Sequence, residues 1–303
     1  IEHGGTCGQH RGEWTVVHQV MVAATPIARE SAQRQLLGIN LYPGGRAPLF
    51  MGHHGQMHTQ RQGGSTVPDI PSHARRRVSS FRSRRAALTE AQQEAWDRLW
   101  PRIGMLARPT ESGDKEHDEP LDTETWFGRT APLVLEIGCG TGTSTLAMAA
   151  AEPDIDVIAV EVYRRGLAQL LCAIDREAIS NIRLIRGDGI DVLEHLVRPG
   201  SLTGVRMFFP DPWPKSRHHK RRLFQQPTVA LITGRLRPGG VLHVATDHRG
   251  YAEQIAVVGN AEPGLRPARR GEPLAISTER PATKYESKAR HAGDAVNEFL
   301  WVK

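Results

Sequence analysis

The chain has 303 residues, of which 39% are hydrophobic and 24% are charged, and its formal net charge is +6. This length allows one or two domains with a sizeable core. Three cysteines without CxxC spacing exclude a disulfide scaffold and argue against a structural zinc site. The chain also lacks the run of about 18 apolar residues that a membrane-spanning helix needs. The composition therefore favours a cytoplasmic protein without a metal or a membrane partner.

The excess positive charge belongs to the N-terminal part of the chain. Residues 1–88 contain 11 Lys and Arg against 4 Asp and Glu, whereas residues 89–303 contain 28 against 29. Residues 43–88 are rich in Gly, Pro and His and contain few residues able to build a core. We therefore predict that residues 1–88 form a basic, low-complexity and disordered extension.

Two further features of this extension bear on its function. The chain begins with Ile, so Met51 or Met57 is a candidate start and residues 1–50 are a candidate non-native segment. Six arginines lie between Arg75 and Arg85. They form either a solvated stretch or an arm that binds phosphate groups.

The first ordered element is predicted to be a helix over 89–101. Thr89 and Gln92 have the spacing of a capping box, and tryptophans recur on one helical face behind them. This face is expected to dock on the main domain, and Pro101 is expected to end the helix. The polar residues 109–120 then read as a linker.

From Leu133 onward, short apolar runs alternate with longer amphipathic stretches. The apolar runs predict strands at 133–137, 157–161, 182–187, 205–209, 241–247 and 296–302. The stretches between them predict helices at 144–151, 163–176, 191–197, 221–236 and 251–258. Such alternation is typical of an α/β protein with a doubly wound, mostly parallel sheet. We assign this domain to residues 89–303.

A glycine-rich turn, LEIGCGTGTST at 135–145, joins the first of these strands to a helix. Its glycines are Gly138, Gly140 and Gly142, and Glu136 precedes them. The G-x-G-x-G spacing resembles the first motif of class I S-adenosylmethionine-dependent methyltransferases rather than the dinucleotide fingerprint G-x-G-x-x-G. A turn without a ligand and an NAD site are the alternative interpretations.

Two more acids follow the next strands. Glu161 ends the second strand, where a carboxylate can accept both hydroxyls of an adenosine ribose. Asp188 follows the third strand, a position that lies beside the adenine in the methyltransferase pattern. The alternatives are a surface acid for Glu161 and a turn-forming residue for Asp188.

The most specific segment is FFPDPWPKSRHHKRR at 208–222, directly after the fourth strand. Three prolines stiffen it, Asp211 is placed at the sheet edge, and Trp213 offers a flat aromatic face. Five Lys and Arg follow within residues 215–222. Such a density of charge can contact several phosphates, although a solvated surface is the usual reading of a charge run.

This segment resembles the signature of the bacterial tRNA (guanine-N7)-methyltransferase family. The resemblance continues in ATDH at 245–248 and TKYE at 283–286, and it extends from about Thr89 to the end of the chain. It implies a class I methyltransferase fold with a seven-stranded sheet. It also implies S-adenosylmethionine as cofactor, tRNA as partner, and methylation of guanine N7 at position 46 of the variable loop.

Carried over residue by residue, the resemblance implies three sets of site residues and no metal ligand. The set implied for the cofactor is Glu136, Gly138, Gly140, Gly142, Glu161, Asp188 and Asp211, with Asp211 also the catalytic residue. The set implied for the substrate guanosine is Lys215, Asp247, Thr283, Lys284, Tyr285 and Glu286. The set implied for RNA is Arg217, His218, His219, Lys220, Arg221 and Arg222.

Several alternatives stay open. One is a non-catalytic RNA-binding module that keeps the fold, and another is a methyltransferase for a different structured RNA. A methyltransferase or dehydrogenase acting on a small molecule or protein is disfavoured by the cationic cluster beside the site. The sequence leaves the choice between monomer and homodimer undecided.

Overall fold

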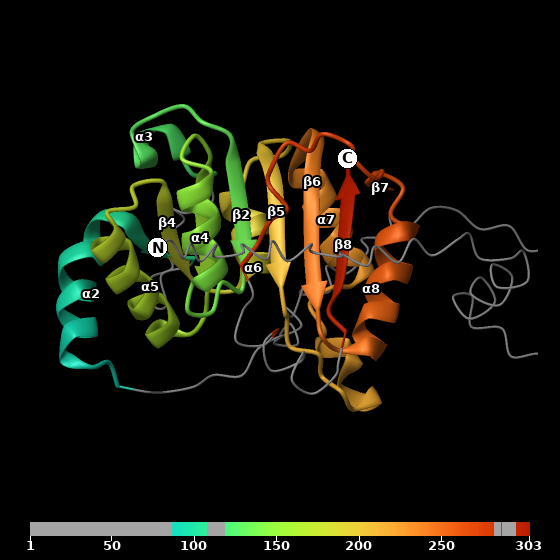
Figure 1. Ribbon diagram of the computed structural model, residues 1–303, viewed down its shortest axis with the longest axis horizontal. Helices are drawn as coiled ribbons and strands as arrows, with labels where there is room; N and C mark the ends of the chain where they lie inside the picture. Colours follow the sequence, from blue (N-terminus) through green and yellow to red (C-terminus); the bar gives the residue numbers. More distant parts are fainter. Residues whose placement is uncertain (1–86, 108–118, 282–285, 287–294) are drawn as a thin grey trace, which may run out of the picture. The chain divides into compact units, whose positions relative to one another are not determined.

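The computed structural model of the protein describes residues 87–107, 119–281, 286 and 295–303 (Figure 1). The predicted extension, including Arg75–Arg85, lies outside these residues except at its last two positions. Most of the linker expected at 109–120 also lies outside them.

In the described part of the chain, eight strands form one sheet in the order β1–β4–β3–β2–β5–β6–β8–β7. Strands β1 to β6 pair in parallel, and β8 runs antiparallel to both β6 and β7. The doubly wound, mostly parallel sheet is thus as predicted. The strands are β1 (Gly104–Leu106), β2 (Leu133–Ile137), β3 (Asp156–Glu161), β4 (Ile182–Arg186), β5 (Leu202–Phe208), β6 (Leu236–Thr246), β7 (Arg266–Pro267) and β8 (Asn297–Val302).

The eighth strand is one more than the seven expected. It arises because the chain leaves the first described helix and continues as β1 along the outer edge of β4, where Gly104 pairs with Leu184. A strand of three residues covers an edge that would otherwise expose unpaired backbone groups. So short a strand has no apolar periodicity for a sequence analysis to detect.

Helices cover both faces of the sheet (Figure 1). Helices α2, α4 and α5 pack on one face, and α7, α8 and the turns α6 and η2 pack on the other. The helical elements are α2 (Glu90–Ile103), α3 (Thr123–Phe127), α4 (Thr143–Ala151), α5 (Arg164–Glu177), α6 (Gly189–Asp191), the π-helical η2 (Val192–Leu196), the 3-10 helix η3 (Ser216–Arg221), α7 (Gln226–Arg235) and α8 (Arg249–Ala261). None of these described helices has the length and apolar character needed to cross a membrane.

The central strand β2 shows why its sequence is apolar throughout. Val134 packs in the cluster beneath α2 and α5, whereas its neighbour Leu135 packs in the cluster beneath α7 and α8. Both side chains are fully buried. Because successive side chains of a strand point to opposite faces, a strand covered on both faces has no polar alternation.

The N-terminal helix α2 begins as predicted and ends later than predicted. Thr89 and Gln92 form the reciprocal capping box, and Trp96 is buried against α5. Pro101 does not end the helix, which runs to Ile103. Pro101 donates no backbone hydrogen bond, but the helix continues beyond it for two residues, and the N–H of Gly104 still donates to the Trp100 carbonyl.

Candidate active site

The sheet changes winding direction between β2 and β5. From β2 the chain proceeds to β3 and β4 on one side, and from β5 it proceeds to β6 and β8 on the other. In open α/β sheets a ligand binds at such a switch point, outside the carboxyl ends of the strands. In Figure 1 these ends lie at the lower edge of the sheet, where the arrowheads of β5 and β6 point. The glycine turn, Glu161, Asp188, the segment 208–222 and Asp247 each lie at or just after one of these strand ends, whereas the motif at 283–286 precedes β8.

The glycine turn after β2 has a backbone that only glycine adopts easily. Gly138 and Gly140 have φ values of +79° and +59°. A Cβ atom added to either would meet no atom of the described residues within 4 Å, so both border open space. Gly142 differs, because its added Cβ would lie 2.4 Å from Leu170 of α5. The first two glycines therefore leave room for a ligand, and the third permits close helix packing.

Glu161, at the end of β3, is bound to the glycine turn. Its Oε2 accepts the backbone N–H of Gly140 at 2.9 Å, and its Oε1 accepts those of Val162 and Tyr163 at 2.7 and 2.9 Å. Burial raises the pKa of Glu161, the three N–H donors oppose that rise, and the negative charge of Asp211 adds to it. The carboxylate of Asp211 is therefore close enough to repel that of Glu161, although the two residues follow different strands.

Glu136 is a buried acid on β2, with 3% of its surface exposed. Burial raises its pKa to about 7, and the Thr145 hydroxyl and the charge of Arg206 only partly offset this. Its Oε2 is buried without a hydrogen-bond partner among the described residues. A buried acceptor without a partner is costly, and the amino-acid end of a cationic cofactor would supply one.

Asp188, after β4, has a local structural role. Its side chain accepts the N–H of Ile190 at 3.0 Å and caps the short helix α6. This agrees with the turn-forming interpretation. Its predicted position beside an adenine is untested and stays a prediction.

Asp211 lies in the segment that leaves β5, and its side chain is exposed. The segment is bounded by two residues with left-handed backbones, Phe209 at φ +51° and Trp213 at φ +42°. Non-glycine residues adopt this conformation at an energetic cost that the surrounding structure must balance. Trp213 is buried rather than offering a free face, with Arg221 over its ring at 4.9 Å.

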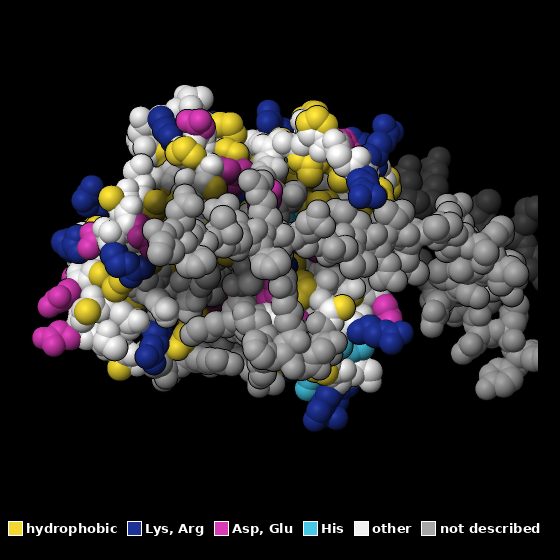
Figure 2. Space-filling view, in the orientation of Figure 1, with side chains coloured by type: hydrophobic (Ala, Val, Ile, Leu, Met, Phe, Trp, Pro, Cys, Tyr) yellow, Lys and Arg dark blue, Asp and Glu magenta, His cyan; other side chains and the backbone are white. Residues whose placement is uncertain are grey.

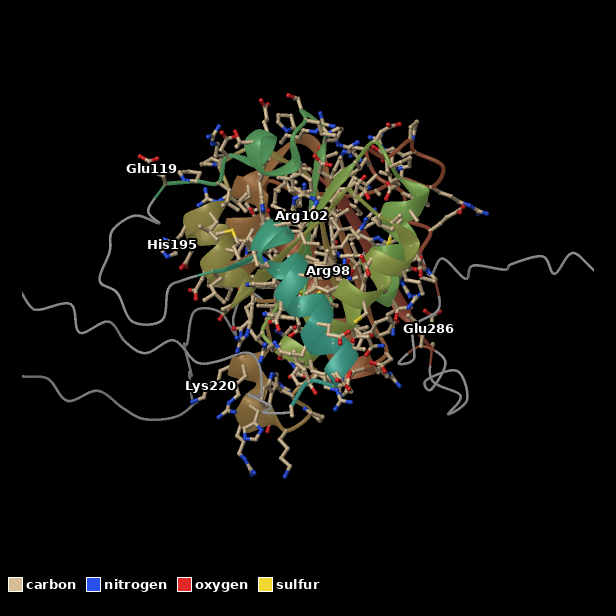
Figure 3. The ribbon with its side chains drawn as sticks, turned by 90° about the vertical axis from the view of Figure 1, so that its left-hand side faces the viewer. Arg98, Arg102, Glu119, His195, Lys220 and Glu286 are labelled. Atoms are coloured by element: carbon tan, nitrogen blue, oxygen red, sulfur yellow. The ribbon has the colours of Figure 1, made fainter. Side chains whose placement is uncertain are left out.

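The cationic run forms the 3-10 helix η3 and the residues around it. Figure 2 shows Lys, Arg and His side chains gathered at the lower edge of the protein, and Figure 3 shows Lys220 at that end. Lys215, Arg217 and Lys220 are exposed, and His218, His219 and Arg221 are half-buried. Most of the predicted RNA-contacting side chains thus lie on a surface next to Asp211.

Arg222 differs from the other cations of this run, and its predicted contact with RNA stays a prediction. Its side chain is buried, with 3% of its surface exposed, and it bonds to the protein itself. The fold turns this position inward because the chain leaves η3 toward Phe224, which is fully buried in the core. A run of charged residues therefore does not show by itself that each side chain is exposed, because Arg222, its last residue, is buried.

Asp247 directly follows β6, which neighbours β5 on the side away from β2, and its side chain is half-buried. The next residue, His248, begins α8 by accepting the N–H of Tyr251 on its Nδ1 at 3.2 Å. The structure thus places Asp211 and Asp247 after adjacent strands at the same sheet edge.

Of the motif at 283–286, only Glu286 can be described, because Thr283, Lys284 and Tyr285 lie outside the described residues. Glu286 is buried and forms an ion pair with Arg280. Arg280 also pairs with Glu298 of β8 at 3.0 Å, and its guanidinium lies 5.2 Å from the ring of Phe209. The sequence analysis does not identify Arg280, which holds Glu286 in place. The one indication in the sequence is that Arg280 lies three residues before the motif.

The described residues contain no group of three or more His, Cys, Asp or Glu arranged to hold a metal ion. The carboxylates and the glycine turn at this edge of the sheet instead suit an organic cation with an adenosine part. Open space beside two glycines, a ribose-type carboxylate and a buried acid without a partner fit S-adenosylmethionine. Glu136, Glu161 and the glycine turn are the residues that would hold it.

Class I methyltransferases and dinucleotide-binding proteins share a doubly wound sheet with a glycine turn and a carboxylate at the end of the neighbouring strand, and the G-x-G-x-G spacing of this turn favours the methyltransferase class. Residues 130–299 match the family model Methyltransf_4, described as "Putative methyltransferase". A tRNA (guanine-N(7)-)-methyltransferase of Mycolicibacterium paratuberculosis is 62% identical over 261 residues, which cover 84% of this chain and 100% of that protein. The chain belongs to the tRNA (guanine-N7)-methyltransferase family.

A protein of the same name from Nocardia farcinica is 63% identical over 236 residues, covering 75% of this chain and 84% of that one. Among solved structures, an rRNA methylase from Streptococcus thermophilus has a TM-score of 0.38 at 15% identity, covering 72% of this chain and 99% of that chain.

Proposed function

We propose that this protein transfers a methyl group from S-adenosylmethionine to N7 of guanine 46 in the variable loop of tRNA. One observation carries the proposal: Asp211 follows β5, which neighbours β2 and its glycine turn in the sheet, and the cations of η3 follow Asp211 directly. The charge of Asp211 acts on Glu161 beside the glycine turn, and the exposed Lys215 and Arg217 follow Asp211 in the chain. A protein that binds RNA and modifies a base needs both surfaces at one place.

Guanine N7 carries an in-ring lone pair and no proton, so the protein has no proton to remove from the nucleophile. S-adenosylmethionine supplies the methyl carbon on a sulfonium. The residues of the chain must align the purine with that carbon and stabilise the charge that develops on it. We propose that Asp211 accepts hydrogen bonds from the N1–H and N2–H₂ edge of the guanine. Its negative charge also stabilises the purine as it becomes cationic.

The remaining site residues divide by location. We propose that Glu136, Glu161, Asp188 and the glycine turn bind the cofactor, and that Lys215, Asp247 and residues 283–286 bind the guanosine. The exposed and half-buried cations of residues 217–221 bind phosphate groups. N7 in a regular A-form helix lies in a deep, narrow groove, so an accessible guanine in folded RNA is the expected target.

The test is methyl transfer from labelled S-adenosylmethionine to a tRNA transcript, beside the same transcript with guanine 46 replaced by adenine. Label in the first transcript and none in the second is the expected result. Label in both would move the target to another guanine. No label in either, with cofactor binding established by calorimetry, would contradict the proposed substrate.

The proposal includes the extent of the catalytic unit and where it acts. We propose that residues 89–303 carry the activity, in the cytoplasm where tRNA is modified. A chain that begins at residue 89 should bind cofactor with the affinity of the full chain. A loss confined to tRNA affinity would assign Arg75–Arg85 to the RNA surface, and a loss of cofactor affinity would contradict this boundary.

A further inference from the structure

Arg222 connects two loops at the carboxyl edge of the sheet. Its Nε donates a hydrogen bond to the carbonyl oxygen of Pro212 at 2.9 Å. Its Nη1 donates to the carbonyl oxygen of Gly250 at 3.1 Å and to Oε1 of Gln254 at 2.7 Å. The guanidinium also lies 4.8 Å from the ring centroid of Tyr251. One buried side chain thus joins the segment after β5 to the first turns of α8.

The joined loops are those that carry the two proposed substrate carboxylates. Pro212 is the residue after Asp211, and Gly250 is three residues after Asp247. We propose that Arg222 is a positioning residue that fixes Asp211 relative to Asp247 and thereby aligns the guanine for methyl transfer. This inference rests on the proposed function of those two acids.

The segment around Asp211 needs such an external restraint. Prolines at 210, 212 and 214 have no backbone N–H and cannot donate hydrogen bonds. Phe209 and Trp213 hold left-handed backbones that are unfavourable in isolation. The bond from Arg222 to the Pro212 carbonyl restrains the segment from outside, at the residue next to the proposed catalytic acid.

The partners of Arg222 are themselves fixed. The Tyr251 hydroxyl accepts the backbone N–H of Phe224 at 2.9 Å, and Gln254 Nε2 donates to the Phe224 carbonyl at 3.0 Å. Phe224 and Tyr251 are both fully buried. Arg222 is therefore attached to the hydrophobic core and not to a mobile surface.

Arginine is suited to this position, and lysine is not. Its planar guanidinium carries five N–H donors in a fixed geometry, so it can reach two carbonyls and one amide at once. Lysine keeps the charge but concentrates its donors on one nitrogen. Arg222→Lys therefore separates a role of charge, as in phosphate binding, from a role of geometry.

The experiment compares three variants of the full chain. Arg222→Lys tests the proposal, and Lys220→Ala removes an exposed cation from the same run. Arg183→Lys is the matched structural control, because Arg183 of β4 also bonds backbone carbonyls, of Trp126 and Ser180 at 2.9 Å each, but at the opposite edge of the sheet. Each variant is measured for melting temperature, tRNA affinity with its salt slope, and single-turnover methyl transfer at saturating tRNA and cofactor.

The expected pattern separates the three roles. Arg222→Lys should lower the transfer rate at saturation by about 10- to 100-fold, with tRNA affinity and salt slope unchanged. Lys220→Ala should weaken tRNA binding and flatten the salt slope. Arg183→Lys should lower the melting temperature without lowering the saturated rate.

Two results would overturn the proposal. An unchanged saturated rate in Arg222→Lys would exclude positioning, and weaker tRNA binding with a flatter slope would make Arg222 an RNA contact. If Arg222→Lys does not fold, Gln254→Ala removes one of its acceptors, and an unchanged saturated rate in that variant would contradict the proposal. Asp211→Asn and Asp247→Asn test the proposed roles of these two acids separately. If both variants keep the full rate of methyl transfer, those roles are wrong irrespective of Arg222.

Discussion

The carboxylate of Glu161 accepts the backbone N–H of Gly140 at 2.9 Å, so the end of β3 is bonded to the glycine turn after β2. The two motifs that the sequence assigns to the cofactor are therefore one structural unit. A change in either should alter the shape of the other.

Glu161→Gln should weaken cofactor binding. The two carboxylate oxygens now accept three backbone N–H groups. In glutamine an NH₂ group replaces one of these oxygens, so at least one backbone N–H loses its acceptor. The expected loss is about tenfold or more in affinity for S-adenosylhomocysteine, measured by calorimetry. Unchanged affinity would show that the coupling between β3 and the glycine turn does not shape the cofactor site.

Gly138→Ala and Gly142→Ala should differ in where the loss appears. Both glycines have positive φ, so each substitution costs about 1–2 kcal/mol in backbone strain. The added Cβ at Gly142 also meets Leu170, whereas that at Gly138 enters the open space proposed for the cofactor. We expect the larger fall in melting temperature for Gly142→Ala.

Cofactor titrations complete that comparison. Gly138→Ala should lose cofactor affinity beyond what its loss of stability explains. Equal stability losses would mean that the contact with Leu170 does not constrain Gly142, and full cofactor affinity in Gly138→Ala would mean that the open space beside Gly138 is not the ligand site.

The stability of the cofactor-free protein should depend on Glu136 between about pH 4.5 and pH 7. Its pKa is raised to about 7 in the folded protein, above its ordinary value of 4.5. The folded state therefore holds a proton that the unfolded state has released, and stability falls as pH rises through this window. Glu136→Gln should remove this part of the slope and be the more stable form above pH 7, by about 1–3 kcal/mol.

Urea unfolding of both proteins at pH 5 and pH 8 measures this effect. The difference between the two proteins at each pH isolates Glu136 from other titrating groups. A difference that does not change with pH would show that Glu136 is ionised in the folded protein throughout.

Removing Arg217 and Lys220 together should flatten the salt dependence of tRNA binding. Both side chains are exposed on or beside η3. For each phosphate that the variant no longer neutralises, the slope of log affinity against log salt should fall by about 0.7–0.9. Gel-shift titrations at several salt concentrations provide the slope, and Arg249→Ala is a control because that exposed arginine pairs with Glu253. An unaltered slope would mean that η3 is a solvated surface only.

Arg280→Gln should destabilise the fold strongly. The substitution removes the ion pairs that the buried guanidinium makes with Glu286 and with Glu298, of which Glu298 keeps its bond to His243. Breaking a buried pair in this way costs about 3–5 kcal/mol. In urea unfolding, the double variant Arg280→Gln with Glu286→Gln should lose less than the sum of the two single variants. Additive losses would contradict a direct coupling between these residues.

The sequence by itself determined the domain type and the order of the loops at the site. LVLEI at 133–137 is apolar at every position except Glu136, as a strand covered on both faces requires. The glycine turn, Glu161 and Asp211 each follow such a run, so their common edge followed from topology alone. The capping box at Thr89 was equally local, and the structure has both of its bonds.

The tertiary structure alone decided which charged residues face solvent and which hold the fold together. Lys220 and Arg222 are two residues apart in one cationic run, yet one is exposed and the other buried. Helix α2 continues past Pro101 because it packs against α5. The eighth strand, β1, forms because residues 104–106 pair with β4. Local patterns encode period and turn chemistry, but burial and pairing depend on residues far away in the chain. For that reason the bonds by which Arg222 joins the segment after β5 to the start of α8 appear only in the folded protein.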